Sequence, residues 1–272
     1  MTSADAPAQD DILHSGEAGG RVVRGGAIRV AGLGIGILFG LATSALLLRH
    51  LGVVDYGRYG TIAALLGLVL ALSDGGLTTI GARELSTTPD GPARRATAST
   101  LMLIRLVTTS VGVLIAIGFA AIAYGSAQMT LGAALIGASV VLISLQAMAS
   151  VPLLITLRIA PMTGFEILRH ALTLVGVLVL VLAEAGLDWF FALQIPIAAV
   201  LLVLTVVYVR RTFPIGIRAE RTAALRLARE TLPLAVASTM VVLYGGAMVI
   251  IVSLIATQYE TGLYATNARV ME

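Results

Sequence analysis

Two charged side chains, Asp74 and Arg105, stand inside long apolar stretches of this sequence. A charged group at the centre of a lipid bilayer costs at least about 2.5 kcal/mol on insertion scales, so it needs a partner or a water-filled cavity. A carboxylate in such a place can carry a proton or a cation, and a guanidinium can bind a phosphate group through paired hydrogen bonds. Asp74 is therefore a candidate for coupling transport to an ion, and Arg105 is a candidate for binding an anionic substrate.

The spacing of these two residues predicts that they meet. Asp74 lies nine residues before Arg83, and Arg105 lies ten residues after Arg95. At 1.5 Å per residue, each would lie about 14 Å along its helix from the flanking arginines. Equal depth on consecutive antiparallel helices permits an ion pair. Two interpretations stay open. The pair is either a structural salt bridge that satisfies both groups, or a pair in which Arg105 leaves Asp74 and binds the substrate.

Polar residues with helical spacing accompany these charges and provide further candidates. Thr108 and Thr109 follow Arg105 by three and four residues, so that one face of this helix is expected to look into the protein. A second stripe repeats at three, four and seven residues: Glu166, Arg169, His170 and Thr173. This stripe contributes either to an internal cavity or, through Arg169, to the membrane interface.

Two more arginines, Arg29 and Arg58, border the first apolar stretches. Together with Arg105 and Arg169 they form a basic set that favours an anionic headgroup over a cationic drug as the transported species. Each of them also has a plainer interpretation, because arginines near the ends of membrane helices set the orientation of the chain.

The composition defines the elements that must position these residues. Of 272 residues, 58% are hydrophobic and 12% are charged, and the mean hydropathy is +0.96. A soluble domain has roughly 25% charged residues. The chain has no cysteine and three histidines, so we expect no metal site and no cofactor other than a coupling ion, H⁺ or Na⁺. The composition indicates an all-α integral membrane protein.

Apolar stretches of about 20 residues, the length that crosses a bilayer, predict about seven transmembrane helices. After a disordered cytosolic tail, residues 1–25, a first bundle of six helices occupies residues 26–213. A basic cytosolic linker, residues 214–229, leads to a seventh helix and the start of an eighth in residues 230–272. The predicted helices of the first bundle are 30–48, 60–82, 101–123, 131–157, 163–183 and 189–209.

The arginines orient these helices, because short cytoplasmic loops retain basic residues. Thirteen arginines fall on the side of the N-terminus: Arg21, Arg24, Arg29, Arg83, Arg94, Arg95, Arg158, Arg210, Arg211, Arg218, Arg221, Arg226 and Arg229. The opposite loops hold Arg49, Arg58 and several acidic residues. We therefore expect a multi-pass protein of the bacterial inner membrane with a cytoplasmic N-terminus, whose surroundings are membrane lipids and not nucleic acid.

A short motif recurs along the chain and suggests an internal repeat. Residues 55–61 and 260–266 both follow the pattern acidic, any, Gly, any, Tyr, small, Thr. Six predicted helices separate the copies, so both lie on the outer face and the repeat is parallel. Only a few residues follow the second copy, too few to cross a bilayer. We therefore expect an N-terminal fragment of a two-bundle transporter.

Several segments resemble polysaccharide flippases, the oligosaccharide-lipid exporters of the multidrug/oligosaccharidyl-lipid/polysaccharide exporter superfamily. They are residues 51–60 (LGVVDYGRYG), 72–77 (LSDGGL), 83–85 (REL), 232–238 (LPLAVAS), 262–264 (GLY) and 269–272 (RVME). The resemblance implies twelve or more helices in two bundles. It further implies alternating access that moves a polyprenyl-pyrophosphate-linked oligosaccharide to the outer leaflet for polysaccharide or lipopolysaccharide synthesis, with other assembly proteins as partners.

The sequence departs from this family at one place, and other functions stay open. Family members often carry an Arg-x-Asp pair midway along helix 7, where this chain has Gly246 and Met248. One alternative is a cation-coupled multidrug exporter, with Asp74 as the coupling carboxylate. Another is a membrane-embedded glycan-lipid enzyme, which the short loops with few paired carboxylates disfavour; we expect no enzyme. A third is an inert half-transporter or membrane scaffold.

Overall fold

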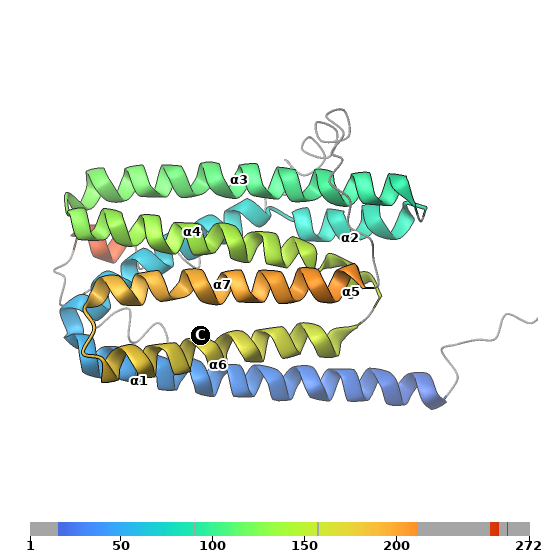
Figure 1. The fold of residues 1–272 in the computed structure, drawn as a ribbon, viewed down its shortest axis with the longest axis horizontal. Coiled ribbons are helices and arrows are strands. Elements are labelled where there is room, and N and C mark those ends of the chain that lie inside the picture. The colour runs from blue at the N-terminus through green and yellow to red at the C-terminus, as the bar shows by residue number, and fades with distance from the viewer. Residues whose placement is uncertain (1–15, 90, 157, 212–250, 256–259, 261–272) are drawn as a thin grey trace, which may run out of the picture.

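The computed structural model describes residues 16–89, 91–156, 158–211, 251–255 and 260. Within these residues every regular element is a helix, and the long helices lie side by side along the long axis of the molecule (Figure 1). The prediction of an all-α membrane protein is confirmed at this level.

The first helix, α1 (Gly16–Asp74), is 59 residues long and consists of two arms that meet at Gly52. Gly52 has φ 74° and ψ 174°, a backbone conformation that is open almost only to glycine. The two arms run in opposite directions from this point (Figure 1). A straight helix of this length would extend about 90 Å, roughly three times the apolar thickness of a bilayer. The turn at Gly52 therefore brings the predicted helices 30–48 and 60–82 into one bundle as two separate crossings (Figure 1).

A break that the sequence analysis did not predict interrupts the second of these helices. α1 ends at Asp74, and α2 (Leu77–Thr87) begins after Gly75 and Gly76, whose φ angles are 44° and 79°. Two consecutive residues in the left-handed region cannot continue a right-handed helix. The stretch 60–82 is apolar apart from Asp74, and glycine does not interrupt an apolar run, so hydropathy gave no sign of this break.

The third and fourth crossings meet where the sequence predicted a turn. α3 (Pro92–Tyr124) begins earlier than expected and carries two arginines in its first turns, and α4 (Ala127–Ala149) follows after Gly125, whose φ is 57°. The predicted helix 131–157 is divided at Ser150, after which the short α5 (Val151–Ile155) has a proline in its first turn. Proline is accepted at that position because its missing N–H has no intrahelical acceptor.

Two further helices complete the described bundle. α6 (Ile159–Leu182) and α7 (Leu187–Arg210) lie close to the predicted ranges 163–183 and 189–209. Five helices of the described part of the chain are long and apolar enough to cross a membrane, and one of them, α1, has two arms. Residues 251–255 are helical, but the rest of the predicted seventh helix, the linker 214–229 and the repeat copy at 261–266 lie outside the described residues.

Glycines allow close contact at several helix crossings. An added Cβ at Gly132 of α4 would lie 2.6 Å from the Phe191 ring of α7, and one at Gly137 would lie 2.5 Å from Val113 of α3. These contacts surround the main apolar cluster, which combines residues of the second arm of α1 with α3, α4 and α7. Small residues at such positions let helix backbones approach closely.

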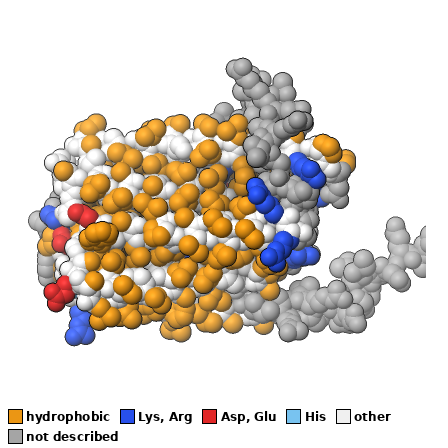
Figure 2. Space-filling view, viewed as in Figure 1, with side chains coloured by type: hydrophobic (Ala, Val, Ile, Leu, Met, Phe, Trp, Pro, Cys, Tyr) orange, Lys and Arg blue, Asp and Glu red, His pale blue; other side chains and the backbone are white. Residues whose placement is uncertain are grey.

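The surface divides into an apolar belt and two charged ends. Figure 2 shows hydrophobic side chains along the middle of the visible face, arginines at one end and most of the acidic groups at the other. The arginine-rich end contains the end of α2, the start of α3, the start of α6 and the end of α7 (Figure 1). It carries Arg83, Arg94, Arg95, Arg158, Arg210 and Arg211. We call this end of the bundle the arginine end.

Candidate functional site: a buried ion pair at a helix break

Asp74 and Arg105 form the predicted ion pair. The Nη1 atom of Arg105 on α3 donates to Oδ1 of Asp74, the last residue of α1, over 2.7 Å. The Arg105 side chain is 3% exposed, whereas that of Asp74 is 35% exposed. The guanidinium is thus enclosed by protein, while its carboxylate partner is open on one side.

The break at Gly75 and Gly76 adds a third member to the pair. Thr78, in the first turn of α2, donates its hydroxyl to the same Oδ1 of Asp74 over 2.5 Å. Asp74 therefore receives one hydrogen bond from α2, beyond the break, and one from α3. Sequence analysis missed Thr78, because Gly75 and Gly76 separate it from the helix that ends at Asp74.

Two buried polar atoms beside the pair have no hydrogen-bond partner among the described residues. They are Nε of Arg105 and Oγ1 of Thr109, one turn apart on α3. Buried polar atoms of this kind are rare in packed proteins and are costly to leave unmatched. The polar face that was predicted for α3 is thus only partly internal: Thr109 is buried, whereas Thr108 is exposed and donates to the Ile104 carbonyl.

The polar residues around the ion pair lie between two separate apolar clusters. The main cluster includes Leu66, Val69 and Val113, and a smaller one at the arginine end consists of Leu77, Leu85, Leu101, Met148 and Val151. Asp74, Thr78, Arg105 and Thr109 form a polar layer between them along α1, α2 and α3. We call these four residues the polar layer.

Arg58 belongs to a different place in the bundle. Its Nη1 atom bonds Oδ1 of Asp55 over 3.0 Å and Oε1 of Gln128, at the start of α4, over 3.4 Å. It precedes Asp74 by sixteen residues on the same arm, about 24 Å along the helix. The structure therefore does not bring Arg58 and Arg105 together.

The other predicted candidates lie on the first arm of α1 and on α6, helices that pack against each other. Arg29 and Glu166 are exposed, and Arg169 is half-buried. The His170 ring lies beside Gly36 of α1, with Cδ2 3.1 Å from the position of an added Cβ. This group lies between the first arm of α1 and α6, whereas Arg105 lies on α3. It forms a second polar region, separate from the polar layer.

Among the described residues, no group of three His, Asp or Glu side chains lies close enough to hold a metal ion. Two polar contacts that the sequence did not predict link other helices: Gln194 on α7 donates to the Tyr59 hydroxyl over 3.3 Å, and Gln146 on α4 donates to Thr205 over 3.4 Å. Both connect crossings within the bundle, a role typical of amide side chains in membrane proteins.

The apolar belt, the membrane-length helices and the buried ion pair define a multi-pass helical membrane protein. A model of the polysaccharide biosynthesis protein family matches residues 46–272, most of the chain, and the chain belongs to this family. The predicted resemblance is thereby confirmed at the level of the family. Searches of curated proteins and of solved structures found no match.

Proposed function

We propose that this chain belongs to a transporter that flips polyprenyl-pyrophosphate-linked oligosaccharide units from the cytoplasmic to the outer leaflet, by alternating access and without chemical change of the substrate. Membership of the polysaccharide biosynthesis protein family supports a role in making polysaccharides. The membrane-length helices support a role within the bilayer. A pyrophosphate headgroup is the part of such a substrate that is hardest to move through lipid, because it is charged.

The observation that carries this proposal is the buried guanidinium of Arg105. Arginine stays charged when it is partly desolvated, and its planar fork matches the oxygens of a phosphate. In the structure, the Asp74 carboxylate accepts a hydrogen bond from Nη1 of this guanidinium over 2.7 Å. An arriving pyrophosphate would replace the carboxylate, so that the arginine always has an anionic partner.

The arginine end of the bundle supports the direction of transport. Basic residues are retained on the cytoplasmic side of a membrane, so this end would face the cytoplasm in a bacterial inner membrane. The polar layer would then be reached from the leaflet where lipid-linked oligosaccharides are assembled. In this arrangement the N-terminus is also cytoplasmic.

The experiment that tests this proposal compares single and paired substitutions of the ion pair. Removing one partner of a buried pair leaves the other charge without a partner and costs about 3 to 5 kcal/mol. We expect Asp74→Asn and Arg105→Gln each to reduce the amount of protein in the membrane, and the double variant to restore it. If Arg105 binds the substrate, the double variant still fails to export glycan in a flippase-deficient cell that the transporter with the unaltered ion pair rescues.

The controls separate a structural role from substrate binding. Recovery of both abundance and export in the double variant would make the pair structural only. Full activity and abundance of both single variants would eliminate both roles. Arg58→Gln is a matched control at the other end of the bundle, because its half-exposed side chain pairs with Asp55 and not with Asp74.

A further inference from the structure

Two breaks between helices lie at the arginine end of the bundle. Gly75 and Gly76 interrupt the second arm of α1, and Ser150 interrupts the segment that continues α4 into α5. The helices beyond the two breaks, α2 and α5, pack against each other. Figure 1 shows both at the same end of the bundle.

The packing of α2 is independent of the main apolar cluster. Leu77 and Leu85 of α2 belong to the small cluster with Leu101, Met148 and Val151, and α2 contributes no residue to the main cluster. Movement of α2 would therefore disturb only the small cluster. The polar layer lies at the boundary, where Arg105 and Thr109 already have unmatched buried atoms.

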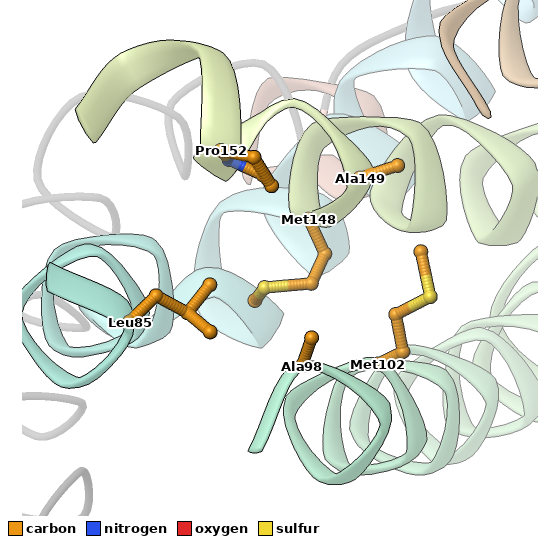
Figure 3. A pocket seen from close by; sticks show the side chains of 6 residues that line it. All are labelled: Leu85, Ala98, Met102, Met148, Ala149 and Pro152. Carbon is orange, nitrogen blue, oxygen red and sulfur yellow. The ribbon is translucent and has the colours of Figure 1, made fainter. Parts of the chain in front are cut away.

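A small apolar cavity, with space for about one water molecule, lies beside α2. Figure 3 shows its lining: Leu85 comes from α2, Ala98 and Met102 from α3, and Met148, Ala149 and Pro152 from α4 and α5. Methionine side chains are unbranched and adapt to changes in the space around them. Two of them face this cavity, so the wall against α2 can repack as α2 shifts.

We infer that α2 moves as a flap about Gly75 and Gly76, and that Asp74 with Arg105 and Thr78 forms its latch. Asp74 lies on the α1 side of the hinge, Thr78 lies on the α2 side, and Arg105 holds the same carboxylate oxygen from α3. The Thr78–Asp74 hydrogen bond is the link across the hinge, and Arg105 holds the Asp74 carboxylate in the position that accepts it. The movement of α2 does not depend on the proposed function. Its role as a gate that opens the polar layer to the cytoplasm does depend on that function.

The absence of cysteine from the sequence makes the flap directly measurable with spin labels. We would label Ser86→Cys on α2 together with Ala147→Cys on α4, both exposed, in the full chain reconstituted in lipid. The matched control pair, Ala121→Cys on α3 and Val203→Cys on α7, lies within the main bundle. Pulsed dipolar spectroscopy then gives the distance distribution of each pair.

If α2 moves, the distances between the two labels of the α2 pair should form two populations or one broad distribution. The distances of the control pair should form one narrow distribution. Asp74→Asn should increase the second population at least twofold, because the neutral side chain accepts the Thr78 hydrogen bond less strongly. Gly75→Ala with Gly76→Ala should also shift the distances away from the main population, because alanine disfavours the left-handed conformations that both glycines adopt in it. Equally narrow distributions for both pairs, or no response to Asp74→Asn, would overturn the inference.

A separate experiment tests whether the movement of α2 gates transport, by fixing α2 to α4. A bifunctional thiol reagent that joins Ser86→Cys of α2 to Ala147→Cys of α4, both exposed, should abolish glycan export, and the same reagent on either single cysteine should leave it unchanged. If the cross-linked protein still exports glycan, the flap is not the gate. If the transporter without these substitutions exports no glycan at all, the proposed function fails, while the spin-label result still decides whether the flap moves.

Discussion

At the scale of single residues, depth along a helix determined which charges meet. The rise of 1.5 Å per residue is the same in every α-helix, so equal distances from the flanking arginines were enough to predict the contact of Asp74 with Arg105. The same argument could not place Thr78, because a glycine break separates it from Asp74. It also could not tell that Thr109 faces inward and Thr108 outward, since adjacent residues differ by only 100° around the helix.

Glycine contacts provide a prediction at this scale. Gly132→Ala places a methyl group 2.6 Å from the Phe191 ring, which is fully buried and cannot move aside freely. We expect a loss of about 1 to 3 kcal/mol in the free energy of unfolding. Gly118→Ala is the control, because no described residue lies within 4 Å of its added methyl group and alanine favours the helix.

Thermal unfolding of the two purified variants in the same detergent measures this difference. Gly132→Ala should unfold at a lower temperature than the unaltered chain, and Gly118→Ala at the same or a higher one. Equal unfolding temperatures would contradict the close crossing of α4 and α7.

At the scale of elements, the turn at Gly52 is the feature that folds α1 back on itself. Its φ of 74° and ψ of 174° suit glycine alone, although there is open space around its α-carbon. We expect Gly52→Ala to cost about 1 to 3 kcal/mol through backbone strain. Gly34→Ala, in the helical first arm and equally unobstructed, should not destabilise the protein. Unfolding measurements that show equal effects of the two changes would contradict the turn.

The positions of the long helices could be predicted from sequence because a bilayer requires about 20 apolar residues in each crossing. The breaks at Gly75 and at Ser150 could not, because the apolar stretches around them continue past both, with Asp74 as their only charged residue. The start of α3 was also missed: Arg94 and Arg95 extend the helix beyond the apolar segment, and a search for apolar residues stops before them. The breaks depend on backbone conformation, which hydropathy does not report.

At the scale of the whole molecule, the distribution of charge predicts orientation. The arginine end should lie in the cytoplasm, with the turn at Gly125 and Ser126 on the opposite side. Single cysteines make this testable in intact cells with a membrane-impermeant thiol reagent. We expect Ser126→Cys to be labelled and Thr87→Cys, exposed at the end of α2, to be labelled only after the cells are opened. The reverse pattern would overturn the orientation.

Direct transfer of a lipid between leaflets tests the central proposal most closely. The transporter that contains this chain would be reconstituted in vesicles with a fluorescent polyprenyl-pyrophosphate-linked oligosaccharide, and a quencher outside the vesicles would report the fraction in the outer leaflet over time. We predict transfer of the pyrophosphate-linked lipid, and no transfer of a polyprenyl-linked sugar that lacks the pyrophosphate. Folded, inserted protein that moves neither lipid, or that moves both at the same rate, would contradict the role assigned to Arg105.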